Sequence, residues 1–285
     1  MTILAWILAL LWGGVVGVAS GLLGIGGGVL VVPFLYLLFG AGWSGMAADP
    51  ATATVVAHAT SLFVVLPTAL SGLREYGSAG MVRWPVVLPM GIAAAISAAL
   101  AARLAVGLPP ELLRGLFGFL LVAVGLRMWP RKTSDEAGTR PPGPMRTGTL
   151  LLLGAGAAVG TFSAVLGVGG GVVAIPLLLY LIRMDMDSVA ATSIGVVAFA
   201  APAGVLSYAV SGWGLPGLPP GTVGFVHLPS ALLMIPAAIV MARLGARWNQ
   251  RMDRRHLQYI FGVLFLLLGG RLLWGGIAAL GAVGA

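Results

Sequence analysis

Apolar segments long enough to cross or nearly cross a membrane recur along almost the whole chain. They fall at 3–22, 28–42, 52–73, 84–102, 112–128, 148–166, 171–183, 189–210, 222–242 and 257–280. A helix of about 20 apolar residues spans the hydrocarbon core of a bilayer, and these segments are too continuous for the alternating pattern of barrel strands. The second and seventh are short and are candidates for half-membrane helices. The sequence therefore predicts an all-α polytopic integral membrane protein.

Charge and cysteine content exclude several other classes of protein. Only 8% of the 285 residues are charged, against about 25% in a typical soluble domain. The net charge of +8 does not indicate nucleic acid binding, because the basic residues lie in loops between apolar segments, where membrane orientation explains them. The absence of cysteine excludes disulfides and thiolate metal sites, and we predict neither a metal nor a cofactor. The N-terminus lacks the basic region of a signal peptide, so we expect a retained first helix.

One glycine-rich motif occurs twice. SGLLGIGGGVLVVP covers residues 20–33 and SAVLGVGGGVVAIP covers residues 163–176, with the serine, four glycines and the proline in the same register. An Ala-Thr-Ser triplet follows at 59–61 and again at 191–193. These matches predict a duplicated chain with about five transmembrane or half-membrane helices in each half. We expect an N-terminal repeat over 1–130, a polar, proline-rich linker over 131–147 and a C-terminal repeat over 148–285.

The basic residues indicate which way the two halves face. If each half has an odd number of segments, all but three of the 16 basic residues lie on one side of the membrane, and those three are Arg103, Arg114 and Arg271. If each half has four crossings, the basic residues divide evenly. Because cytoplasmic loops are rich in Lys and Arg, the odd count is favoured. The second half is then inverted relative to the first, the linker is cytoplasmic, and both termini lie outside the cytoplasm.

Each glycine triplet predicts a broken helix at membrane depth. Glycine costs helix stability, about 1 kcal/mol per residue relative to alanine, and the freed backbone groups need partners within the protein. Inverted repeats of broken helices are typical of secondary transporters, which bind substrate at the repeat interface. The exposed N–H groups of a half-helix favour an anion, and glycine lets the anion approach closely. We therefore predict a small anion bound between the two glycine motifs.

The candidate substrate-binding residues come from both halves. They are Ser20, Gly24, Gly26, Gly27, Gly28, His58, Thr60 and Ser61 in the first half, and Ser163, Gly167, Gly169, Gly170, Gly171, Thr192 and Ser193 in the second. Two other roles stay open. Glycines spaced four residues apart, as at Gly13, Gly17 and Gly21, also indicate close helix packing, and Ser or Thr hydroxyls can bond to their own helix.

His58 is an ionisable residue inside an apolar segment, which is a hypothesis of function by itself. It shares a helix face with Thr54 and Ser61. Because histidine titrates near neutral pH, protons are a candidate coupling ion. The alternative is a neutral histidine hydrogen-bonded between helices, and its counterpart in the second half is Ala190. No basic residue is close to either glycine motif in the sequence, and no acidic residue lies mid-segment, which disfavours a carboxylate-based cation pump.

These motifs resemble those of the TauE/SafE permeases, the sulfite exporter family. The resemblance is carried by GLLGIGGGVLVVPFL and VLGVGGGVVAIPLLL, followed by ATSLF and ATSIG. Ala59 and Ala191 depart from the glycine that usually precedes Thr-Ser in this family. The resemblance implies a multi-pass permease of the bacterial inner membrane that exports a small anion such as sulfite or an organosulfonate.

The sequence is compatible with two other transport functions. A passive anion channel would have the same fold, and the substrate could be a carboxylate without sulfur. An enzyme would need Ser20 or Ser163 as a nucleophile with His58 as its base, but no serine lies in a G-x-S-x-G motif, so we expect no enzymatic activity. The expected partners are a small anion and the lipid bilayer. A homo-oligomer is compatible with the sequence, which fixes neither the direction of transport nor the oligomeric state.

Overall fold

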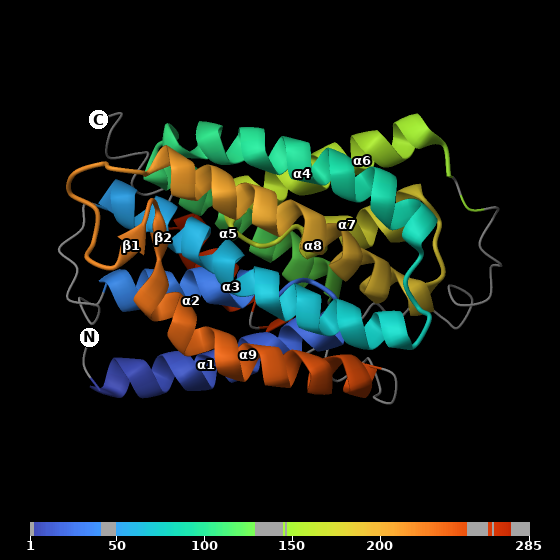
Figure 1. Ribbon diagram of the computed structural model, residues 1–285, viewed down its shortest axis with the longest axis horizontal. Coiled ribbons are helices and arrows are strands. Elements are labelled where there is room, and N and C mark those ends of the chain that lie inside the picture. Colours follow the sequence, from blue (N-terminus) through green and yellow to red (C-terminus); the bar gives the residue numbers. More distant parts are fainter. Residues whose placement is uncertain are drawn as a thin grey trace.

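The structure is a bundle of long helices (Figure 1). This computed structural model describes residues 3–40, 50–128, 145, 147–249, 262, 263 and 265–274. The helices of the first half are α1 (Ile3–Leu23), α2 (Gly28–Gly40), α3 (Pro50–Ser78), α4 (Trp84–Val106) and α5 (Pro110–Met128). The second half contains α6 (Thr149–Leu166), α7 (Gly171–Pro176) with a π-helix (Leu177–Leu181), α8 (Met186–Ser211) and α9 (Leu228–Asn249), then an apolar helix, Phe265–Trp274.

The prediction of an all-α polytopic membrane protein is confirmed. Among the described residues, five helices are long and apolar enough to cross a membrane; they begin at Ala51, Trp84, Thr149, Asp187 and Leu228. Of the predicted linker over 131–147, only residues 145 and 147 belong to the described part of the chain. The termini, residues 1, 2 and 275–285, also lie outside it.

Two helices are interrupted where the sequence repeats its glycine motif. The first break separates α1 from α2, and the second separates α6 from α7. Three glycines of each break have positive φ angles: Gly24, Gly26 and Gly27 at 70°, 79° and 74°, and Gly167, Gly169 and Gly170 at 65°, 78° and 83°. Residues with a side chain adopt this conformation only at a cost in free energy. The 13 described residues of α2 extend over about 20 Å, less than a bilayer core of about 30 Å.

The first helix of each half packs against the fourth helix of the other half. A Cβ atom on Gly17 of α1 would lie 2.4 Å from the carbonyl oxygen of Ala238 in α9, and one on Gly160 of α6 would lie 2.0 Å from that of Ala94 in α4. Backbones can approach this closely only where a helix carries no side chain. The glycines at four-residue spacing therefore bring helices of different halves together.

Matching helices of the two halves run in opposite directions through the bundle. In Figure 1, α1 begins at the left and α6 at the right, and α3 and α8, as well as α4 and α9, are likewise antiparallel. The inverted duplication of the chain stays a prediction.

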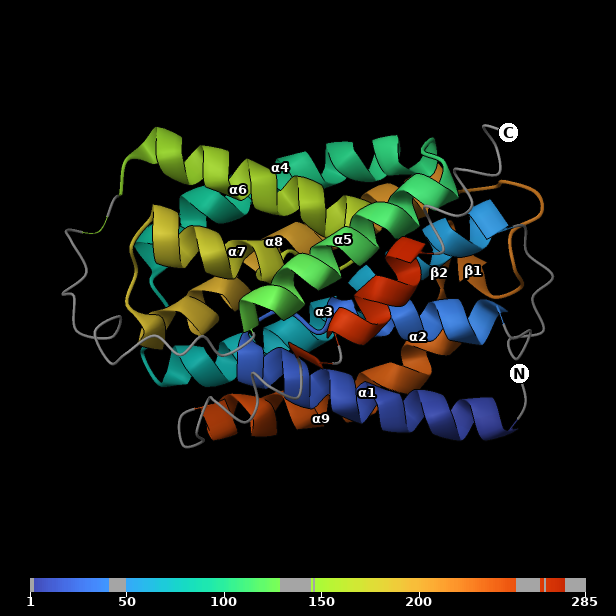
Figure 2. The ribbon, with the colours of Figure 1, turned by 180° about the vertical axis from the view of Figure 1, so that it is seen from behind.

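Helix α5 lies on the far side of the bundle from α9 and runs obliquely beside the helix Phe265–Trp274 (Figure 2). Their backbones meet at glycines, since a Cβ atom on Gly118 would lie 2.6 Å from the nitrogen of Leu273. In this position the first turns of α5 lie near α2 and α3, and α5 contributes a basic residue there.

The region before α9 differs from the sequence prediction. An apolar segment was expected to begin at 222, but residues 222–227 form a small antiparallel hairpin of β1 (Thr222–Val223) and β2 (Val226–His227). Gly221 and Gly224 have φ angles of 83° and 55°, which favour a turn over a helix. Helix α9 therefore starts six residues later, at Leu228.

Candidate functional site

The two helix breaks meet each other in the interior of the protein. A Cβ atom on Gly28 would lie 2.6 Å from the carbonyl oxygen of Gly167, and one on Gly171 would lie 2.6 Å from the backbone of Ile25. Every glycine predicted for the site is buried, as are all of the predicted histidine, serine and threonine residues. The fold thus brings together residues that are more than 100 positions apart.

Ser61 and Ser193 connect the breaks to the central helices α3 and α8. The hydroxyl of Ser61 donates to the carbonyl oxygen of Gly167 at 2.7 Å, and that of Ser193 donates to the carbonyl oxygen of Gly24 at 3.0 Å. Each serine therefore bonds to the break of the other half. These bonds satisfy carbonyl groups that the interrupted helices leave without a partner, as the membrane interior requires.

Thr60 and Thr192 bond to the starts of other helices. The Thr60 hydroxyl accepts from the backbone N–H of His227, directly before α9, at 2.9 Å. The Thr192 hydroxyl accepts from the backbone N–H of Arg83, directly before α4, at 3.2 Å. In this conformation both threonines position helices, and their predicted contact with substrate stays a prediction.

Ser20 and Ser163 are the hydroxyl pair without an assigned structural role. Both are fully buried, and within the described residues neither Oγ atom has a hydrogen-bond partner. Each lies beside a break, since a Cβ atom on Gly27 would be 3.2 Å from that of Ser20, and one on Gly170 would be 3.1 Å from that of Ser163. A buried polar group that lacks a partner is costly, so these two hydroxyls are candidates for ligand binding.

His58 lies between the second break and a polar cluster that the sequence did not reveal. Its Nε2 atom is hydrogen-bonded to the Tyr36 hydroxyl at 2.6 Å. The guanidinium of Arg114 lies 5.3 Å from the centre of the Tyr36 ring, and its Nε donates to the Thr54 hydroxyl at 2.9 Å. On its other side, the Cα of His58 would be 2.7 Å from a Cβ on Gly167. A basic residue does therefore lie near the site, because α5 supplies it from a distant part of the sequence.

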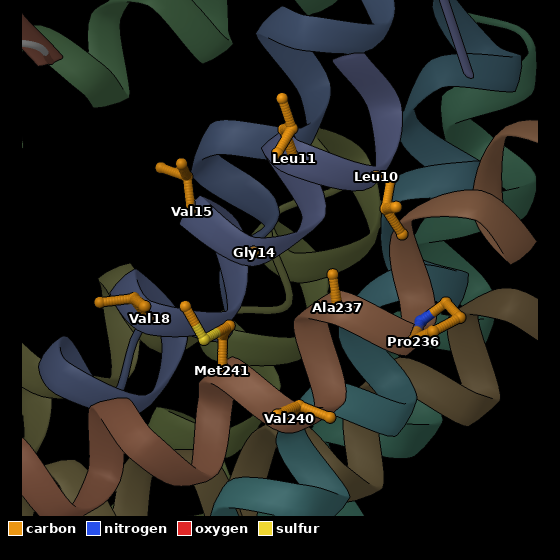
Figure 3. Close-up of a pocket in the computed structure, with 9 residues that line it drawn as sticks. All are labelled: Leu10, Leu11, Gly14, Val15, Val18, Pro236, Ala237, Val240 and Met241. Carbon is orange, nitrogen blue, oxygen red and sulfur yellow. The ribbon is translucent and has the colours of Figure 1, made fainter. Parts of the chain in front are cut away.

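A separate groove on the outside of the bundle is apolar throughout. It lies between α1 and α9 (Figure 3) and is lined by Leu10, Leu11, Gly14, Val15, Val18, Pro236, Ala237, Val240 and Met241. Exposed apolar side chains such as Leu11 and Val240 suit contact with lipid acyl chains. Without a polar side chain, this groove offers nothing to bind an anion, and the candidate site remains at the breaks.

Long apolar helices, two of them broken and meeting in the interior, define a polytopic membrane protein of the transporter class. Residues 6–272 match the sulfite exporter TauE/SafE family, and the chain belongs to that family. The protein is a membrane transporter, as the names of its relatives indicate.

Several relatives match nearly end to end. A "Probable membrane transporter protein" of Methanocaldococcus jannaschii is 27% identical over 92% of this chain and 93% of its own length. One of Haemophilus influenzae is 26% identical over 92% of this chain and 95% of its own length, and one of Bacillus subtilis is 22% identical over 96% and 99%. No solved structure matches the chain with significance. Similarity that covers both halves shows that the whole fold is shared with these transporters.

Proposed function

We propose that the protein is a secondary transporter that exports a small anion, such as sulfite or an organosulfonate, bound between the two helix breaks. The observation that carries the proposal is the pair of buried hydroxyls, Ser20 and Ser163, which lie beside the breaks without hydrogen-bond partners. The family's description as sulfite exporters supports the choice of substrate class and of direction.

The chemistry of the breaks suits an anion. Helix α2 begins at Gly28, and the first N–H groups of a helix have no partner within it and carry partial positive charge. The glycine backbone leaves room for an oxyanion to approach these groups closely. A hydroxyl can donate one more hydrogen bond from each half. Among the described residues that the close approaches and serine hydrogen bonds place at the breaks, none is acidic.

Alternating access follows from the arrangement of the halves. Equivalent contacts recur on both sides of the breaks, as in the bonds from Ser61 to Gly167 and from Ser193 to Gly24. We propose that the second half is inverted relative to the first and that the breaks open to one side of the membrane at a time. In this proposal the linker is cytoplasmic, and both termini lie outside the cytoplasm of a bacterial cell.

Transport by the reconstituted protein tests this function. Proteoliposomes would be given labelled sulfite, sulfoacetate and acetate, with and without an imposed pH gradient. We expect saturable movement of a sulfur oxyanion that the gradient accelerates. Movement that does not saturate would instead support a passive channel, transport of acetate alone would support a carboxylate substrate, and movement of none of the three would contradict the proposal.

The serine pair gives the matching test of the site. We expect Ser20→Ala and Ser163→Ala each to raise the KM for the transported anion by about tenfold to a hundredfold, because a hydrogen bond to a charged group is worth about 1.5–3 kcal/mol. Thr161→Ala is the control, since Thr161 is on the same helix as Ser163, is exposed, and bonds to its own helix. An unchanged KM in both serine variants would contradict the site.

A further inference from the structure

The polar cluster around His58 occurs in one half only. The positions that match Tyr36, Thr54 and His58 in the second half are Leu179, Met186 and Ala190, none of which can take part in such a cluster. The breaks and their serine bonds recur in both halves without these residues. The cluster is therefore not needed to build the repeated framework, and it makes the two breaks chemically unequal.

Arg114 favours one direction for the hydrogen bond between Tyr36 and His58. A guanidinium 5.3 Å from the ring centre withdraws electron density from the phenol and makes its O–H a better donor. The same positive charge opposes a second positive charge on the nearby imidazole. Both effects favour a neutral His58 whose Nε2 accepts from Tyr36 at 2.6 Å. The ring proton of that tautomer is on Nδ1.

The Nδ1 atom of this histidine is buried and has no hydrogen-bond partner among the described residues. The backbone of Val165, at the end of α6, interacts with the imidazole but makes no hydrogen bond to Nδ1 of standard geometry. His58 also contacts the second break, because a Cβ atom on Gly167 would lie 3.0 Å from the Cβ atom of His58. The residue next to the break thus offers a directed donor that lacks an acceptor.

We propose that Nδ1–H of His58 donates to an oxygen of the bound anion at the second break, and that Tyr36 and Arg114 are positioning residues that hold the imidazole in this tautomer. This inference depends on the anion site proposed above and gives that site a polarity, meaning that its two ends bind the anion differently. The anionic group docks closer to the Gly167 break than to the Gly24 break. A ligand with several acceptor oxygens and a full negative charge fits this set of donors better than a neutral molecule of the same size.

Three substitutions test the roles of the cluster, with sulfite and sulfoacetate as the probes. Tyr36→Phe keeps the ring and removes the donor, and we expect the KM to rise about tenfold while Vmax changes less than twofold. His58→Gln places its amide near the position of Nε2 and is expected to show the same loss. His58→Asn places an amide N–H near the position of Nδ1 and is expected to restore most of the affinity. A purely structural role of His58 would not distinguish the two amides.

Arg114→Gln is expected to raise the KM as Tyr36→Phe does, whereas Arg103→Gln is its control, because Arg103 is an exposed basic residue on α4. Size-exclusion profiles and thermal unfolding in detergent would show that each variant is folded. An unchanged KM in Tyr36→Phe, or equal KM values for His58→Gln and His58→Asn, would overturn the inference. If the serine variants lose affinity and the Tyr36 variant does not, the proposed site stands and this polarity fails. If the unmodified protein neither binds nor transports the probes, both fail.

Discussion

Backbone conformation at single glycines determines where the two helices break. Gly27 and Gly170 both have positive φ angles and lie against the preceding helix of their own half. Any other residue would be strained there, by about 1–2 kcal/mol from the backbone alone. The breaks therefore need residues without a side chain. This need explains why the motif is rich in glycine although glycine disfavours helices.

We expect Gly170→Ala to lower the thermal stability of the detergent-solubilised protein. The alanine methyl group would lie 2.7 Å from a methyl carbon of Val159, so steric repulsion adds to the strain of φ. Gly80→Ala separates the two effects, because Gly80 also has a positive φ, 69°, but has nothing within 4 Å of the added methyl. The midpoint of unfolding should fall further for Gly170→Ala. Equal shifts would mean that packing at the break contributes nothing.

Among single residues, the sequence predicted the glycines and the buried serines as candidates for the site, because they recur at matching positions in the two halves. It did not predict Tyr36 and Arg114 as neighbours of His58. Nothing in the sequence indicates that α5 passes beside α2, since that contact depends on tertiary packing. Likewise, a repeated Thr-Ser pair indicates a shared role but does not tell which hydroxyl bonds to a break and which to a helix start.

At the scale of helices, contacts between glycine-rich faces hold the two halves together. The pairs α1 with α9 and α6 with α4 approach at glycines, where the backbones touch. In a membrane such packing replaces the hydrophobic effect as the source of helix association. The spacing of these glycines was recognised in the sequence, but their partners were not, because each lies in the opposite half.

Two substitutions within α6 test this packing. Gly160→Ala should strongly reduce the yield of folded protein, since the methyl group would lie 2.0 Å from the Ala94 carbonyl oxygen. Gly154→Ala, on the same helix with nothing within 4 Å of the added methyl, should be neutral or stabilise by up to about 1 kcal/mol through helix propensity. Unfolding in detergent and expression yield measure both. Similar behaviour of the two variants would contradict the packing described for α6 and α4.

For the whole molecule, the proposed topology rests on the distribution of basic residues in the sequence. In Figure 1, α3 and α9 both end toward the right, where α6 begins. That these ends share the cytoplasmic side of the membrane stays a prediction. The sequence could not give the contacts across the bundle, which depend on the shape of the packed helices.

Single-cysteine labelling tests this topology in a chain that has no cysteine of its own. We expect Ser134→Cys, in the linker, and Gln250→Cys, just after α9, both to react only with reagents that reach the cytoplasm. Modification of the two positions from opposite sides of the membrane would refute the inversion of the halves. An unmodified chain, treated in parallel, serves as the control for background labelling.

The pairing of α1 with α9 has a consequence for synthesis. Helix α1 leaves the ribosome well before the helix that covers its glycine face, which begins only at Leu228. More than 200 residues must be inserted before this contact can form, so assembly of the bundle is necessarily late and depends on a distant partner. During that interval the glycine face of α1 is available to any other helix in the membrane. Any contact that another helix makes with this face has to be released before α9 can pack against α1.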